Sequence, residues 1–363
     1  MRNGWVLDRL LRSGGLDVLW PDVTGTLLEM GFQHADIQRA MGGVKHLAAM
    51  PRAWHRLGRQ HLRRADDELA KGHTLTAAET YHRAASCFVR ARWGFTGEER
   101  TEVYRELDAA YDKVIELGPD RIERVVVNNV PGLLHLPAGP GPHPAVVLYP
   151  GMDMTKEYLP VPGRNIFAER GLAVLVLDPP GHGAALQQGV HLRERNAEQA
   201  GSAAVDLLQT RAEVDADRIG VFGISLGSYF AASLCTLEPR IRAGVSFEGG
   251  VFYDKVRFIQ ESQPTFGVQL AQMTGLTGDA LHEVLRGMTM DGREGQVTVP
   301  YLIATGEEDE LCPLADVERL HAGLGGPKHL IVHEGENHVL GGVAHEALRE
   351  CVDWLTDNLS KKD

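Results

Sequence analysis

The chain has 363 residues, of which 43% are hydrophobic and 24% are charged, and its formal net charge at pH 7 is -12. This length suffices for one large domain or two ordinary ones, and the recurring apolar residues exclude extensive disorder. The net negative charge argues against a general affinity for nucleic acids or anionic membranes.

The cysteines and the N-terminus bear on the compartment. The cysteines lie far apart and form no CxxC pair: Cys87, Cys235, Cys312 and Cys351. We therefore expect neither a disulfide framework nor a zinc site, and a reducing compartment. The first twenty residues lack the pattern of a signal peptide, and no apolar run is long enough to span a membrane. We expect a cytoplasmic protein without nucleic-acid or membrane partners.

Residues 1–118 have a helical pattern that ends at Gly118-Pro119. Apolar residues recur at helical spacing in three stretches, residues 51–72, 76–88 and 103–117. Thr76 and Glu79 have the spacing of a capping box at the start of the second helix. The sequence thus predicts a helical N-terminal region that acts as a lid or cap and through which a homodimer would form.

Residues 119–363 alternate short apolar runs with helical stretches. The first two runs, 122–128 and 132–136, are expected to form antiparallel strands. The later runs are typical of buried parallel strands and cover residues 145–149, 173–177, 219–222, 243–247, 301–305 and 329–333. Such alternation predicts an α/β fold, a three-layer sandwich with a mostly parallel sheet covered on both faces.

One connection in this region is unusually long. After the sixth predicted strand the next strand is delayed, and residues 250–298 are expected to form a cap insertion. Aromatic side chains in the insertion would either line a pocket or pack the cap onto the body, namely Phe252, Tyr253, Phe258 and Phe266.

The pattern G-x-S-x-G occurs at Gly223 to Gly227, with Ser225 at its centre. By itself the pattern is weak, but an apolar strand precedes it and a helical stretch follows it. Glycines on both sides permit the tight strand-to-helix turn that exposes a serine hydroxyl at a helix N-terminus. The sequence therefore predicts Ser225 as a nucleophile.

A serine nucleophile needs a base and an acid, which follow it in the order Ser, acid, His in folds with this elbow. Asp309 follows the strand 301–305, and His338 follows the last strand, 329–333. Because parallel strands end at one edge of the sheet, the three side chains can converge. The competing residues are Glu307, Glu308 and Glu248 for the acid, and His333 and His345 for the base.

An oxyanion hole requires two backbone N–H donors close to the nucleophile. Leu226 follows Ser225 directly and is the first candidate. Met152, in the loop after the strand 145–149, is the second. This chemistry needs no metal and no organic cofactor.

Residues 214–227, with Asp178 to Gly183, Thr305 to Asp309 and Gly335 to His338, resemble the landmarks of the α/β hydrolases in the expected order. The likeness covers about residues 121–359. The helical extension, the cap and Thr155-Lys156-Glu157 are similar to the group around 2,6-dihydroxypseudooxynicotine hydrolase and the fermentation–respiration switch protein.

That resemblance implies hydrolysis of a carbon–carbon bond beside a ketone, or shortening of a polyketide, on a small apolar or aromatic carbonyl substrate. It also implies an extra carboxylate in the cap, for which Glu261 and Asp254 are the counterparts considered. A carboxylesterase or thioesterase with the same triad is an alternative. A non-catalytic binding protein on a hydrolase fold is an alternative of another class.

Overall fold

The structure is a computed structural model that describes residues 4–15, 17–18, 20 and 22–360. The chain forms two compact units. The first comprises Met1–Arg121 together with Glu157–Asn165, and the second comprises Ile122–Lys156 together with Ile166–Asp363. Each unit is described by itself below.

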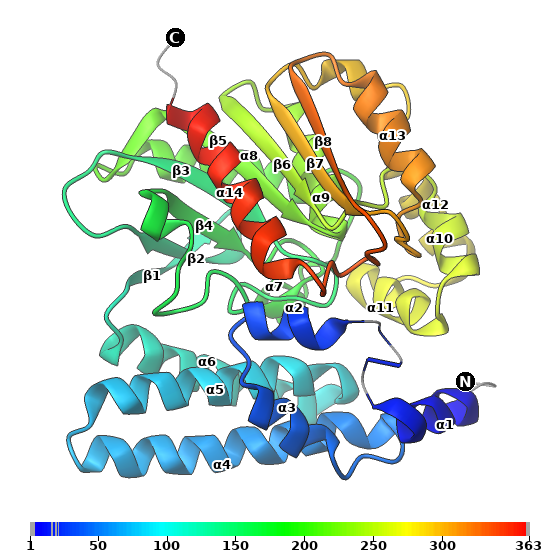
Figure 1. The fold of residues 1–363 in the computed structure, drawn as a ribbon. Coiled ribbons are helices and arrows are strands. Elements are labelled where there is room, and N and C mark those ends of the chain that lie inside the picture. Colours follow the sequence, from blue (N-terminus) through cyan, green and yellow to red (C-terminus); the bar gives the residue numbers. More distant parts are fainter. Residues whose placement is uncertain (1–3, 16, 19, 21, 361–363) are drawn as a thin grey trace. The chain divides into compact units, whose positions relative to one another are not determined.

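The first unit is helical (Figure 1). Its elements are α1 (Gly4–Gly14), α2 (Val23–Glu29), α3 (His34–Met41), η1 (Leu47–Ala49), α4 (Met50–Ala70), α5 (Thr74–Ala91), η2 (Arg92–Gly94) and α6 (Gly97–Leu117). Trp54, Phe88 and Tyr111 are fully buried among the three long helices α4, α5 and α6. Helix α5 begins at Thr74 without a side-chain cap, so the capping box predicted at Thr76 is wrong.

The second unit contains an eight-stranded sheet (Figure 1). Its strands are β1 (Arg121–Val127), β2 (Val130–Leu136), β3 (His143–Tyr149), β4 (Ala173–Leu177), β5 (Val214–Ile224), β6 (Ile241–Phe247), β7 (Tyr301–Gly306) and β8 (Lys328–His333). Their order is β1-β2-β4-β3-β5-β6-β7-β8. Strand β2 runs antiparallel to β4, and the strands from β4 to β8 are parallel. The predicted mostly parallel α/β sheet is confirmed.

Helices cover both faces of this sheet (Figure 1). They are α7 (Gly183–Gln187), α8 (Asn196–Gln209), α9 (Leu226–Cys235), α13 (Leu314–Gly323) and α14 (Ala344–Ser360), with η3 (Ala168–Arg170) before β4. Successive residues of β5 point to opposite faces: Val221 joins the cluster containing Leu234 of α9, whereas a side chain at Gly220 would meet Leu355 of α14. The strand is apolar throughout this stretch because both faces are buried.

Three helices and a short turn lie between β6 and β7, where the sequence predicts a cap. They are α10 (Lys255–Glu261), α11 (Pro264–Thr274), α12 (Gly278–Gly287) and η4 (Glu294–Gln296). Phe252 is fully buried, and the rings of Phe258 and Phe266 lie 5.3 Å apart. These aromatics belong to, or pack against, the buried cluster that also contains Tyr301 of β7, so they pack the cap onto the body of the unit. Among the described helices, none combines the length and the apolar character needed to cross a membrane.

Candidate active site

Ser225 occupies the turn between β5 and α9, with φ 53° and ψ -115°. A positive φ is strained for a residue with a side chain, so neighbouring contacts must hold it. Its backbone N–H donates to the carbonyl oxygen of Phe247 at 2.9 Å, which ties the turn to β6. A Cβ at Gly223 would lie 2.2 Å from the carbonyl oxygen of Gly227, so this close approach requires glycine.

A chain of hydrogen bonds joins three side chains that the sequence singles out. The Ser225 Oγ lies 2.8 Å from His338 Nε2, and His338 Nδ1 lies 2.9 Å from Asp309 Oδ2. His338 and Asp309 are only 5% and 6% exposed. Burial alone would lower the pKa of His338, but the charge of Asp309 and its hydrogen bond outweigh burial and raise that pKa. The arrangement thus favours an imidazolium when the serine gives up its proton.

Among the neighbouring acidic residues, Asp309 is the one whose side chain is buried and points toward His338. Glu307 and Glu308 are exposed, and Glu307 accepts a hydrogen bond from the backbone N–H of Gly335. Glu310 accepts from the backbone N–H of His338 at 3.2 Å and so ties the histidine loop to the acid loop.

The competing histidines take other places. His333 is the last residue of β8, and His345 lies in the first turn of α14. His338 lies on the loop between these elements, where its ring reaches both Ser225 and Asp309.

The two predicted oxyanion donors belong to segments that flank Ser225. Leu226 is the first residue of α9, and Met152 lies in the loop after β3. A Cβ at Gly151 would be 3.5 Å from the Cβ of Ser225, so this loop is adjacent to the serine. Among the described residues, neither Leu226 N–H nor Met152 N–H donates to a backbone carbonyl.

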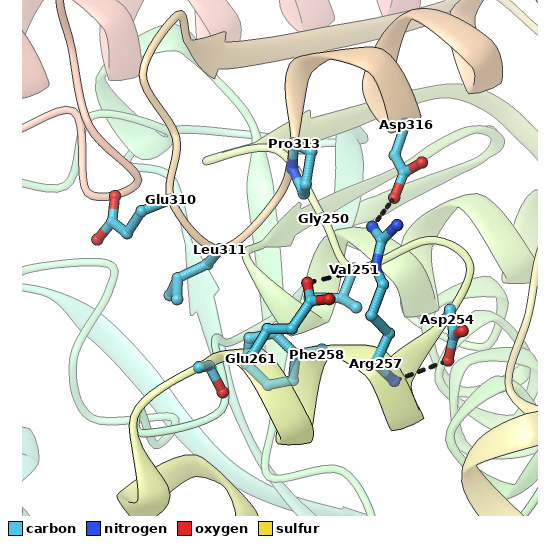
Figure 2. A pocket seen from close by; sticks show the side chains of 11 residues that line it. Gly250, Val251, Asp254, Arg257, Phe258, Glu261, Glu310, Leu311, Pro313 and Asp316 are labelled. Atoms are coloured by element: carbon cyan, nitrogen blue, oxygen red, sulfur yellow. Dashed lines mark hydrogen bonds and ion pairs between the residues drawn. The ribbon is translucent and has the colours of Figure 1, made fainter.

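The predicted cap carboxylates serve the cap itself (Figure 2). Asp254 caps α10 by accepting hydrogen bonds from the N–H groups of Val256 and Arg257, at 3.0 and 2.8 Å. Glu261 is exposed and pairs with Arg257 at 3.7 Å, and Arg257 also contacts Asp316. Within the described chain, neither carboxylate forms a hydrogen bond or ion pair with the serine or histidine of the site. Their assignment as the extra cap carboxylate stays a prediction.

Both cap carboxylates line a pocket between α10 and the loop that follows β7. Its wall includes Gly250, Phe258, Leu311 and Pro313, so it borders the segment that carries Asp309. Figure 2 shows Arg257 lying between Glu261 and Asp316 in this pocket. Arg257 is the one basic residue among the residues that line the pocket, whereas Asp254, Glu261, Glu310 and Asp316 are acidic, so the lining carries a net negative charge.

Two buried groups near the histidine were not assigned a function from the sequence. Glu248, which the sequence suggests only as a rival acid, directly follows β6 and is 4% exposed. Cys312 Sγ, a carboxylate oxygen of Asp309 and a ring nitrogen of His338 all lie within 4.8 Å of one another. These three could hold a metal ion, but Asp309 and His338 already satisfy each other. Burial raises the pKa of the Cys312 thiol to about 11, so it is not a thiolate at neutral pH.

A buried ion pair supports the loop after β3. Lys156 Nζ lies 3.0 Å from Asp178 Oδ2, and the backbone N–H of Lys156 donates to Asp178 Oδ1 at 2.9 Å. Asp178 Oδ2 also accepts from the N–H of Ala184 at 2.8 Å. The pair therefore links the loops after β3 and β4 at the sheet edge where Ser225 lies.

The profile of the FrsA-like esterases matches residues 52–360. The chain belongs to this family. An α/β-hydrolase enzyme of the esterase or C–C-hydrolase type is therefore confirmed, as is the predicted resemblance to the group around these proteins.

Individual proteins are similar to this chain as well. A 2,6-dihydropseudooxynicotine hydrolase from Paenarthrobacter nicotinovorans is 30% identical over 346 residues, which cover 92% of this chain and 91% of that protein. Esterase FrsA of Escherichia coli O1:K1 / APEC is 31% identical over 190 residues, 49% of this chain and 42% of that protein. The crystal structure of the 2,6-dihydroxy-pseudo-oxynicotine hydrolase matches with a TM-score of 0.80 and 27% identity, covering 93% of this chain and 96% of that one.

Proposed function

We propose that this FrsA-like protein is a serine hydrolase that acts on a carbonyl substrate through an acyl-enzyme. Ser225 is the nucleophile, His338 is the general base, and Asp309 orients the imidazole. The observation that carries the proposal is the continuous hydrogen-bonded chain from Ser225 Oγ through His338 to Asp309, at 2.8 and 2.9 Å. Ser225, the first residue of this hydrogen-bonded series, lies on a strained elbow, which is typical of α/β-hydrolase nucleophiles.

The reaction begins when Ser225 Oγ attacks the carbonyl carbon and its proton passes to His338 Nε2. The N–H groups of Met152 and Leu226 hold the resulting oxyanion. As the tetrahedral intermediate collapses, the bond to the leaving group breaks and the imidazolium returns the proton to that group. A water then loses a proton to His338, attacks the acyl-enzyme and releases the acid, and Ser225 recovers its proton.

For the substrate we propose a small apolar or aromatic ketone whose C–C bond next to the carbonyl is hydrolysed. The likeness to the 2,6-dihydropseudooxynicotine hydrolase over nearly the whole chain supports this class. An ester or thioester is the second candidate, supported by the FrsA-like esterase profile. Both use the same triad and differ only in the leaving group.

A fluorophosphonate probe tests the nucleophile. We expect the purified chain to be labelled at Ser225, and the variant Ser225→Ala to remain unlabelled. Folded wild-type protein that resists labelling would contradict the enzyme proposal and favour a binding protein. Labelling that persists in Ser225→Ala would identify a different nucleophile.

The bond that is cleaved is tested with two simple substrates. We expect a higher kcat/KM for 1-phenylbutane-1,3-dione, measured by its loss of absorbance, than for 4-nitrophenyl butanoate. The reverse order, with both activities lost in Ser225→Ala, would assign the protein as an esterase.

A further inference from the structure

Glu248 follows β6 directly, and hydrogen bonds hold the backbone of the residues on both sides of it. The carbonyl oxygen of Phe247 accepts hydrogen bonds from the backbone N–H of Ser225 at 2.9 Å and from Ser228 Oγ at 3.0 Å. On the other side, the N–H of Gly249 donates to the carbonyl oxygen of Ala304 at 3.0 Å. Glu248 itself has φ 63°, which is strained for a non-glycine residue. These bonds therefore set the direction of its side chain within the elbow region.

The carboxyl of Glu248 is buried beside the charged groups of the site. The side chain is 4% exposed, and its Oε1 atom has no hydrogen-bond partner among the described residues. The charges that reach it belong to three loops: Asp153 after β3, Asp309 after β7 and His338 after β8. Burial raises the pKa of Glu248 to about 8, although the charge of His338 opposes this shift.

Two ordinary explanations of a buried carboxyl do not apply to Glu248. It is not the acid that orients the histidine, because Asp309 accepts the hydrogen bond from His338 Nδ1. It is also not satisfied as a structural buried group normally is, since Oε1 lacks any partner in the described structure. An unpaired buried polar atom costs about 1–3 kcal/mol, so its retention calls for an explanation, and a role in catalysis is one that fits its place beside His338.

We propose that Glu248 is held as a neutral carboxylic acid and donates a hydrogen bond to an uncharged oxygen that the substrate carries near its scissile carbonyl. This inference rests on the proposed serine-hydrolase function. A neutral carboxyl donates one hydrogen bond, whereas a carboxylate only accepts. The site should therefore prefer a ketone, ether or alcohol oxygen at this position over a methylene, and should lose this preference when Glu248 ionises.

The test uses two esters of equal size, 4-nitrophenyl 3-methoxypropanoate and 4-nitrophenyl pentanoate, which differ by one ether oxygen. The measured quantity is the ratio of their kcat/KM values from pH 6 to pH 10 on the full chain. Titration of His338 affects both esters and cancels in this ratio. We expect the wild-type ratio to favour the ether ester at pH 6 to 7 and to fall at least fivefold above pH 8.

Three variants distinguish an effect of the Glu248 carboxyl from an effect of its surroundings. Glu248→Gln retains N–H donors and cannot ionise, so its ratio should stay high across the pH range. Glu248→Leu should lower kcat/KM at least tenfold for the ether ester and less than threefold for the pentanoate. Glu308→Gln, the matched control for an exposed carboxylate, should behave as wild type. If Glu248→Leu does not fold, the Gln variant alone decides.

Equal losses for the two esters in Glu248→Leu, or a ratio in Glu248→Gln that falls as in wild type, would overturn the proposal. Fluorophosphonate labelling keeps the two proposals apart. If Ser225 is labelled but the ratio does not depend on Glu248, only the role of Glu248 is wrong. If Ser225 is not labelled and neither ester is hydrolysed, the serine-hydrolase function is wrong. If Ser225 is labelled but neither ester is turned over, each ester is tested as a competitor of the labelling. The ester concentration that halves the labelling rate then takes the place of kcat/KM in the comparison.

Discussion

Cys312 donates its backbone N–H to Asp309 Oδ1 at 2.7 Å. The N–H of Leu311 donates to the same oxygen at 2.9 Å, so Asp309 Oδ2 remains for the ring of His338. The loop after β7 therefore holds the carboxylate in one orientation before any substrate binds. Because the side chain is already held in place, replacing one carboxylate oxygen of Asp309 by an amide nitrogen tests its role without a change of shape.

Asp309→Asn should lower kcat by about 10³–10⁴-fold, because an amide cannot stabilise the imidazolium and selects the wrong ring tautomer. The unfolding temperature should change little, since the amide keeps the shape. Steady-state kinetics and the rate of fluorophosphonate labelling check this. Glu308→Gln, an exposed neighbour, is the control; an equal loss in both variants would contradict the role of Asp309.

Replacing Ser225 with glycine should abolish activity and still stabilise the fold relative to alanine. The positive φ of Ser225 is strained for alanine as well, whereas glycine adopts it freely. We expect Ser225→Gly to unfold with a free energy about 1 kcal/mol higher than Ser225→Ala. Urea denaturation of the two inactive variants measures the difference, and equal stability would show that the elbow stores no strain.

Gly227→Ala should prevent the elbow from packing. The added Cβ would lie 2.3 Å from the carbonyl oxygen of Tyr149 and 2.7 Å from that of Pro150, and backbone atoms cannot move aside separately. We expect a loss of at least about 3 kcal/mol, in the range of severe overpacking. Thermal unfolding followed by circular dichroism checks it. Gly295→Ala, with its nearest contact at 3.9 Å, should unfold as wild type.

Lys156→Met should strongly destabilise the protein, because it leaves the charge of Asp178 in the interior. Removing one partner of a buried pair costs about 3–5 kcal/mol. Burial would raise the pKa of Asp178, but Lys156 and backbone N–H groups hold it below 3.8. Stability from this carboxylate is thus present above pH 3.8 and lost on acidification, so the wild-type advantage should shrink at low pH. Urea denaturation at pH 7 and pH 3.5 tests this; the added change Asp178→Asn should recover part of the loss.

Glu248→Gln should alter the pH dependence of stability. Because the folded-state pKa of about 8 exceeds the ordinary 4.5, the stability due to the neutral carboxyl is complete below pH 4.5. It is lost as pH rises toward 8, by up to about 1.4 kcal/mol per pH unit. Between pH 5 and pH 8 the unfolding temperature of Glu248→Gln should therefore rise relative to that of the wild type. A constant difference would indicate an ionised Glu248, and Glu308→Gln is again the control.

The short-range features of the fold were predictable from the sequence. The run over residues 145–149 lies within β3, and the runs over 173–177 and 243–247 match β4 and the core of β6, because buried parallel strands are continuously apolar. The short helices α1, α2 and α3 were not predicted. At 7 to 11 residues they are too short to be stable by local propensity alone, and tertiary packing stabilises them.

Local sequence determined the nucleophilic elbow and the chain order of Ser225, Asp309 and His338, since turn chemistry and hydrophobic periodicity act over about ten residues. Only the tertiary structure decided which acid faces the histidine and which is buried without a partner. Asp254 and Glu261 look as suitable in sequence as Glu248, yet Asp254 caps a helix and Glu261 is exposed. Side-chain direction and burial arise from strands and loops that are distant in the chain, so no local pattern encodes them.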